Sequence, residues 1–306
     1  MTTISGRWKL GILLALSTAT MWGLLPIALS GLLTTIDPVT TTFFRLSLAA
    51  ALMTPYLIVR RRLPNRGKLR VPRLFFQLTA AGVLLCGNYG LYIFGLERTS
   101  PEAAQVMIQV APMLLLLAGI FLFKEPFSSF QWLGFFAFGS GLILFFNHHL
   151  GDVFADFNDY GAGLLMIVLA AMCWTGYAII QKILLQQFTS EETMLAIYWL
   201  GTLAFLPFCN FSTLDQLTGL QWGLLAFCGL NTIIAYGCFA EALVHIEASR
   251  VSATIAMTPL LTVGIVQLMP FENISAEPLG FISLLGASMV VAGSITSAAA
   301  KKAHKT

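Results

Sequence analysis

The sequence has few charged residues. Asp, Glu, Lys and Arg make up 10% of its 306 residues, and hydrophobic residues make up 57%, whereas about a quarter of a soluble domain is charged. This composition excludes an ordinary water-soluble domain and predicts an all-α integral membrane protein. The net charge of +3 is too small to indicate a nucleic-acid partner.

The sequence also lacks paired cysteines. Its cysteines are scattered through apolar runs, and no two of them have the spacing of a disulfide framework or a zinc site. We interpret them as small hydrophobic residues within the membrane, and we expect no metal and no cofactor. They are Cys86, Cys173, Cys209, Cys228 and Cys238.

Motifs of membrane enzymes and channels are missing as well. The chain has no paired-aspartate motif for polyprenyl substrates, no HExxH and no GxSxG. It also has no acidic or carbonyl-rich filter motif of the kind that channels use. We therefore do not expect an enzyme, and a channel is not favoured.

Long apolar runs dominate the sequence. Ten of them are long enough to span a bilayer, and the connections between them are too short to hold a soluble domain. The expected spans are 10–29, 39–59, 74–96, 101–123, 130–147, 160–185, 194–210, 220–243, 250–270 and 278–298.

Basic residues predict the orientation of these spans. Arg7 and Lys9 precede a first run that is too long for a signal peptide and has no small-residue cleavage site, so we expect an uncleaved span. If the N-terminus is cytoplasmic, all but two of the 17 Lys and Arg residues lie on the cytoplasmic side of the membrane. The exceptions are Arg98, which falls outside, and Arg45, which lies within the second span. The positive-inside rule therefore predicts that both termini are cytoplasmic.

The two halves of the chain resemble each other. A shift of 147 residues aligns Pro112 with Pro259 and Tyr89-Gly90 with Tyr236-Gly237, and a shift of 152 aligns Trp22 with Trp174. Each half holds five expected spans, an odd number, so the two copies must cross the membrane in opposite directions. Such inverted repeats are typical of secondary transporters, with the substrate site near midplane.

The expected organisation has four parts. A first unit, 10–147, is followed by an external linker, 148–159, a second unit, 160–298, and a basic cytoplasmic tail, 299–306. The linker contains two histidines and three aspartates, but their spacing matches no metal site, so we interpret it as a solvated hinge.

Three stretches resemble a known family. MWGLLPIA (21–28), FFRLSLAAAL (43–52) and FLFKEP (121–126) are similar to EamA-type transporters of the drug/metabolite transporter superfamily. The second copy departs from the pattern at Asn273, where KEP has proline. The resemblance implies a bacterial inner-membrane exporter of amino acids, related metabolites or toxic compounds, with a cavity lined by helices one, three, four, six, eight and nine.

The fourth span carries polar residues at helical spacing. Gln105, Gln109 and Pro112 are four and three residues apart, so they are expected on one face. Two interpretations are open: the amides line a substrate cavity, or they bond neighbouring helices together. In the second copy Ser252 and Ala256 replace the amides while the proline is kept. This pattern indicates that the prolines serve a mechanical role in both halves, whereas the amides determine substrate specificity in one half.

Other spans supply further candidates. Aromatic rings near amides suit a planar or apolar part of a substrate, although Trp and Tyr are also ordinary membrane-interface residues. The expected cavity residues are Trp22, Asn88, Tyr89, Tyr92, Gln105, Gln109, Trp174, Tyr177, Asn231, Tyr236 and Ser252. The expected hinge or gating residues are Pro26, Pro112 and Pro259.

Ionisable residues within the spans are few. Arg45 lies about 9 Å from the outer end of its helix, where it either snorkels, pairs with an acid or faces the cavity. The sequence shows no obvious midplane carboxylate for a proton relay. Proton-coupled transport and facilitated diffusion therefore both stay open.

These observations predict an inner-membrane secondary transporter. We expect it to export small organic metabolites, such as amino acids or amphipathic and aromatic analogues, by alternating access. The alternatives are other cargo, namely a toxic compound, a nucleotide sugar or a lipid-linked precursor, and, with much less support, a membrane enzyme. The expected partners are the small-molecule substrate and the bilayer, with a homodimer left open.

Overall fold

Helices account for all regular structure in the described part of the chain. The computed structural model describes residues 7–64, 66–123, 128–150, 158–246, 251, 254–269 and 279–298, and no strand occurs among them. The α-helices are α1 (Trp8–Leu33), α2 (Pro38–Val59), α3 (Arg66–Leu69), α4 (Pro72–Glu97), α5 (Pro101–Met107), α6 (Val110–Phe123), α7 (Ser129–Phe145), α9 (Asp159–Leu184), α10 (Ser190–Phe205), α11 (Gly219–His245), α13 (Thr258–Leu268) and α14 (Phe281–Ala298). Three short 3-10 helices are η1 (Asn147–His149), η2 (Leu206–Phe208) and η3 (Phe211–Gln216).

Several of these helices suit a membrane. Six apolar stretches are long enough to cross it: Trp8–Leu33, Pro38–Val59, Pro72–Glu97, Pro101–Leu122, Asp159–Leu184 and Gly219–Phe239. Three further apolar helices are shorter. Large apolar side chains such as Phe76, Phe121 and Phe136 are exposed on the outer surface, where lipid is the fitting solvent. The all-helical membrane class is confirmed, and the count of ten spans stays a prediction.

Local sequence signals explain where the helices begin. Ser128, Thr189 and Thr218 each form a capping box with the residue three positions later, at the starts of α7, α10 and α11. Each hydroxyl accepts a bond from a free backbone N–H, which stabilises the first turn. Proline occupies the first position of α2 and α5, where its missing N–H costs nothing.

The expected fourth span is broken between α5 and α6, at Ile108 and Gln109. Pro112 explains the break, because it has no N–H to donate to the Ile108 carbonyl four residues earlier. The N–H of Ala111 donates to that carbonyl instead, with N···O 2.9 Å, in the tighter 3-10 pattern. The two amides and the proline therefore do not follow one continuous helical stripe.

A second break precedes Pro259. The backbone turns at residues 256–257, and α13 begins at Thr258. Pro259 leaves the Ile255 carbonyl without its helical partner, and the Thr258 hydroxyl donates a hydrogen bond to it. Threonine is one of the residues that satisfy such freed carbonyls in membrane helices.

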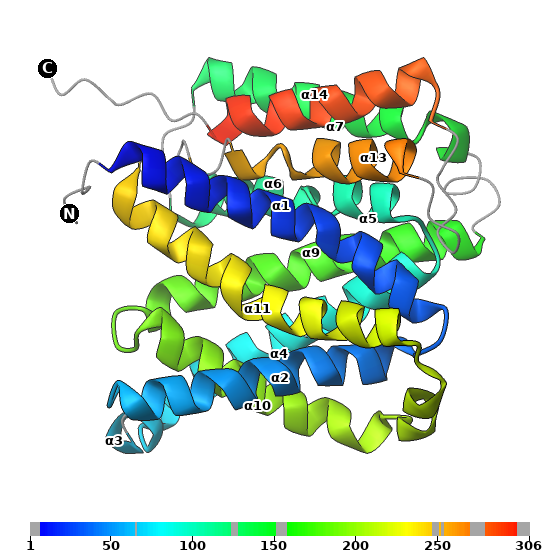
Figure 1. The fold of residues 1–306 in the computed structure, drawn as a ribbon. Helices are drawn as coiled ribbons and strands as arrows, with labels where there is room; N and C mark the ends of the chain where they lie inside the picture. Colours follow the sequence, from blue (N-terminus) through cyan, green and yellow to red (C-terminus); the bar gives the residue numbers. More distant parts are fainter. Residues whose placement is uncertain are drawn as a thin grey trace, which may run out of the picture.

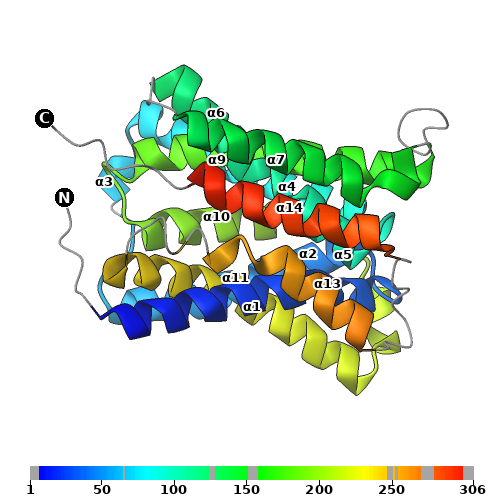
Figure 2. The same cartoon turned by 90° about the horizontal axis from the view of Figure 1, so that it is seen from above.

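The helices stack side by side across the molecule (Figure 1). The bundle runs from α7 and α14 at one edge to α2 and α10 at the other, and the view from above shows α1 beside α11 (Figure 2). The most extensive packing joins α1 to α11, α4 to α9 and α7 to α14. The start of α1, the end of α14 and α3 lie at the same end of the bundle.

Glycines allow α7 and α14 to approach closely. Gly134 and Gly141 of α7 face Gly293 and Gly286 of α14. A Cβ atom at Gly293 would lie 2.4 Å from the backbone nitrogen of Phe138, which cannot move aside as a flexible side chain would. Small residues at such positions let membrane helices pack backbone against backbone.

We predict that Gly293→Ala lowers stability, whereas Gly139→Ala does not. The first change forces α7 and α14 apart, and overpacking of this kind costs about 1–3 kcal/mol. The second places a methyl group where no described atom lies within 4 Å. Thermal unfolding in detergent measures both. Equal unfolding midpoints for the two variants would contradict the close packing.

Candidate functional site

A pocket of about 460 Å³ lies between α2, α10 and α11. At one end are Glu191 and Glu241, whose side chains are 35% and 59% exposed, so this end meets solvent. Apolar residues line most of the remaining wall. The lining residues are Leu52, Met53, Tyr56, Ser190, Glu191, Met194, Tyr198, Leu230, Ile233, Ile234, Tyr236, Gly237 and Glu241.

Tyr198 and Tyr236 are aromatic residues of the pocket wall. Tyr198 is buried, and its hydroxyl donates to the Thr232 carbonyl at 3.0 Å. The Tyr236 ring packs edge-on against Trp22, with ring centroids 5.3 Å apart. The structure therefore brings two predicted residues from opposite halves of the chain together, Trp22 and Tyr236.

Arg45 lies deeper along α2 than the pocket residues. It is seven residues before Leu52, on the same helix face, and only 3% of it is exposed. Its guanidinium carbon lies 4.9 Å from the centroid of the Tyr89 ring. Tyr198 and Tyr236 are also within electrostatic range of Arg45.

The two predicted asparagines bond helices together. Asn88 of α4 donates to the Ala170 carbonyl of α9 at 2.9 Å, and Asn231 of α11 donates to the Met21 carbonyl of α1 at 2.6 Å. Hydrogen bonds between helices are a common use of amides in membranes. The Oδ1 atom of Asn231 is buried and has no partner in the described chain.

The two predicted glutamines differ from the asparagines. Gln105 and Gln109 are each 8% exposed, and neither side chain bonds to another described residue. The Nε2 atom of Gln109 is buried without a partner. The glutamines therefore do not bond the described helices together, but they do not line the pocket either, and their cavity role stays a prediction.

The remaining aromatic candidates pack near Tyr89. Tyr177 is buried on α9, and its hydroxyl donates to the sulfur of Met194 at 3.1 Å. Tyr177 and Tyr89 belong to one buried cluster, against which Trp174 packs. Tyr92 packs against a different cluster, which contains Leu29 and Ile93. Ser252 lies outside the described residues.

The predicted hinge prolines have different surroundings. Pro26 is buried within α1, which continues as one helix through it. Near it, the Gly23 carbonyl accepts a bond from the Thr262 hydroxyl of α13 at 2.8 Å. Pro112 is exposed and Pro259 is buried, and each follows a helix break. The hinge role of these prolines stays a prediction.

Two buried polar residues were missed by the sequence analysis. Glu102 is fully buried at the start of α5 and accepts a bond from Gln267 of α13 at 3.2 Å. The signal for it is the helix start Ser100-Pro101-Glu102, which precedes an otherwise apolar span. Tyr198 lies midway along α10, which corresponds to the expected seventh span, and the family resemblance did not assign that span to the cavity.

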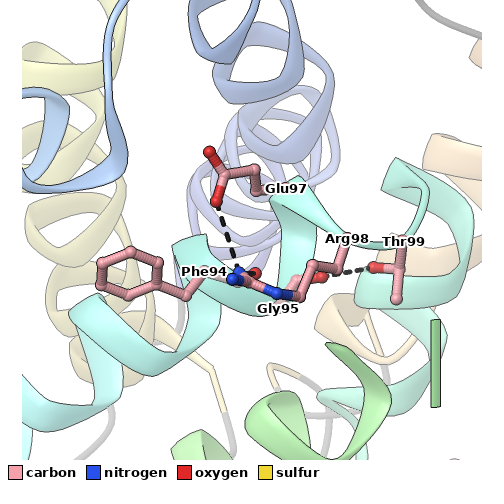
Figure 3. A network of polar contacts seen from close by, with 5 residues as sticks. All are labelled: Phe94, Gly95, Glu97, Arg98 and Thr99. Atoms are coloured by element: carbon pink, nitrogen blue, oxygen red, sulfur yellow. Dashed lines mark hydrogen bonds and ion pairs between the residues drawn. The ribbon is translucent and has the colours of Figure 1, made fainter. Parts of the chain in front are cut away.

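Local hydrogen bonds stabilise the end of α4, just before the connection to α5 on which Glu102 lies (Figure 3). Arg98 donates to the Phe94 carbonyl at 2.9 Å and lies 3.3 Å from a carboxylate oxygen of Glu97. Thr99 donates to the Gly95 carbonyl at 2.8 Å. These bonds set the direction in which α5 starts, and hence where Glu102 lies.

Comparison with known proteins gives consistent matches. The sequence profile of the EamA-like transporter family matches residues 9–147 and again residues 161–298. The uncharacterized inner membrane transporter YhbE of Escherichia coli K12 is 38% identical over 292 residues, which cover 94% of this chain and 91% of that protein. An uncharacterized transporter of Haemophilus influenzae is 34% identical over 296 residues, 96% of each chain.

A solved crystal structure shares the fold. The two chains superpose with a TM-score of 0.65 and 16% identity, covering 95% of this chain and 97% of the other. At this identity the likeness concerns the fold alone.

We predict that Asn231→Leu lowers the unfolding midpoint in detergent, whereas Gln109→Leu leaves it unchanged or raises it. Asn231→Leu removes a bond between α11 and α1, a loss of about 0.5–1.5 kcal/mol for a membrane protein. Gln109→Leu removes a buried amide that has no partner. An equal loss of stability in both variants would indicate that Gln109 forms a hydrogen bond between helices.

Proposed function

The chain belongs to the EamA-like transporter family, and from this premise we propose that it is a secondary carrier that exports small organic metabolites by alternating access. It is a multi-pass protein of the inner membrane, like its relatives. The observation that carries the proposal is the largely apolar pocket with three tyrosines in its wall, which lies between helices from both halves of the chain.

Alternating access here rests on two inverted halves, and the helix packing supports them. If each expected span is exchanged for its counterpart five spans away, the pair α1–α11 becomes α9–α4, and α1–α13 becomes α9–α6. In each of these four pairs, the two helices are in contact. The pairs α2–α10 and α7–α14 map onto themselves, as expected for a two-fold axis between the halves.

Individual contacts follow the same relation. The Thr18 hydroxyl of α1 donates to the Ala235 carbonyl of α11 at 3.2 Å. The shifts that align the sequence repeats carry these positions to Ala170 and Asn88, and Asn88 donates to the Ala170 carbonyl. Equivalent positions are thus bonded in both copies by different side chains.

The pocket is proposed to open to the cytoplasm. Its Glu191 end lies with the basic segment around α3, where Arg62 is 3.8 Å from Glu191, and basic ends of membrane proteins face inward. At the opposite end of the bundle, where α5 begins (Figure 1), the contact between Glu102 and Gln267 joins the two halves. We interpret this contact as part of a closed outer side.

The lining favours substrates with an apolar or aromatic part, such as amino acids and their amphipathic analogues. Tyr56, Tyr198 and Tyr236 of the pocket wall offer ring faces and edges for such groups. Toxic compounds of similar character are alternative cargo. Nucleotide sugars and lipid-linked phosphates are less suited, because Arg45 is the only basic residue well inside the expected spans.

We predict that vesicles reconstituted with the protein release aromatic or aliphatic amino acids down their gradient. Flux is measured with labelled amino acids, with protein-free vesicles as the control. No flux for any of them would contradict the amino-acid proposal. A pH gradient imposed on the same vesicles tests coupling, since accelerated flux indicates proton coupling and unchanged flux indicates facilitated diffusion.

A further inference from the structure

Arg45 is a buried cation without a counter-ion in the described chain. It is 3% exposed, forms no ion pair, and its Nε atom has no hydrogen-bond partner. Removing a charge from water carries a large penalty that a partner must offset. The contact with the Tyr89 ring at 4.9 Å recovers only part of it, because cation–π attraction is the weaker effect.

A second donor lies beside Arg45. The buried Tyr89 hydroxyl lies beside the Tyr236 hydroxyl and bonds to no backbone acceptor, whereas the Tyr198 hydroxyl donates to the Thr232 carbonyl. Two hydroxyls that bond to each other use only one of their two hydrogens, so Arg45 and the pair Tyr89–Tyr236 still present spare donors at one place between α2, α4 and α11. Donors without acceptors call for an anionic acceptor from outside the chain.

One wall of the pocket lies along α2, the helix that carries Arg45. Leu52 lines the pocket, and Arg45 is on the same face of α2, about 10 Å further along the helix. Tyr236 contributes to the pocket wall and is within electrostatic range of both Arg45 and Tyr89. Arg45 and Tyr89 do not line the pocket themselves, so a solute entering at the Glu191 end would reach them past the Tyr236 side chain.

We propose that Arg45, assisted by the Tyr89 hydroxyl, binds the carboxylate of the transported solute. This inference rests on the proposed carrier function and adds the substrate class, a monocarboxylate with an apolar or aromatic body. The planar guanidinium matches a carboxylate with two parallel hydrogen bonds. A single cation suits a monoanion better than a phosphate dianion, for which the described spans offer no second basic side chain near Arg45.

A matched pair of probes tests the proposal. Phenylacetate and phenylacetamide have the same shape and differ in charge, and their binding to the purified protein in detergent is measured by calorimetry. We expect phenylacetate to bind at least tenfold more tightly to the wild type. We expect Arg45→Gln to reduce this preference to within twofold with phenylacetamide binding unchanged, and Arg45→Lys to keep part of it.

The control is Arg73→Gln, which removes an equal charge from the exposed start of α4 and should keep the wild-type preference. Three results would overturn the proposal. They are the absence of a carboxylate preference in the wild type, its persistence in Arg45→Gln, and tighter binding of phenylphosphonate than of phenylacetate.

Stability without ligand separates a binding role from a structural one. Because Arg45 has no counter-ion among the described residues and its contact with the Tyr89 ring offsets only part of the cost of burial, Arg45→Gln should unfold at the same temperature as the wild type or higher. A midpoint lowered by several degrees would assign Arg45 to the fold and overturn the proposal. Binding is measured without transport, so a carboxylate preference in a protein that shows no flux would contradict the carrier function alone.

Discussion

Packing between the two halves of the chain is the constraint on which the rest of the structure depends. The largest interfaces, α1 with α11, α4 with α9 and α7 with α14, each join a helix of the first half to one of the second. The pocket also lies between the halves, because α2 belongs to one and α10 and α11 to the other. Any movement that opens the other side of the protein must therefore rearrange these shared interfaces.

Side-chain hydrogen bonds cross between described helices of the two halves. In lipid the hydrophobic effect does not drive helices together, so close packing and interhelical hydrogen bonds carry the association. Asn231 and Thr262 both bond carbonyls of α1, on either side of Trp22. The same helix contains Pro26, so the segment around Trp22 is held by both α11 and α13.

The prolines add local breaks to otherwise regular helices. Pro112 and Pro259 occupy equivalent positions in the sequence repeat, and a turn precedes each of them. The freed carbonyl of Ile108 is satisfied by a backbone N–H, and that of Ile255 by a threonine hydroxyl. Such breaks are tolerated at membrane depth only where the backbone is satisfied in this way.

From the sequence, the class of this protein can be predicted more reliably than the contacts that its side chains make. Hydropathy and the quoted motifs suffice for the membrane class and the family, and both are confirmed. The direction of individual side chains is harder to predict, because helices that are apolar on all sides give no amphipathic pattern to orient them. Asn88 and Asn231 were therefore grouped with the cavity residues, although their amides bond neighbouring helices.

The buried contact of Glu102 was missed for a related reason. Its partner Gln267 is 165 residues away, and nothing in either local sequence indicates that the start of α5 meets α13. The sequence indicates that Arg45 is unusual, and only the structure shows its burial and its lack of an ion pair among the described residues, which argue against snorkelling and against pairing with an acid.

The central claim is that the pocket is open to one side of the membrane at a time. It is tested most directly by placing a cysteine at Ile233, which lines the pocket, in a variant without the five native cysteines, and by labelling it with an impermeant thiol reagent. The account predicts labelling in inside-out vesicles without substrate, and new labelling in right-side-out vesicles when a transported substrate is added. Labelling from one side only, under all conditions, would contradict it.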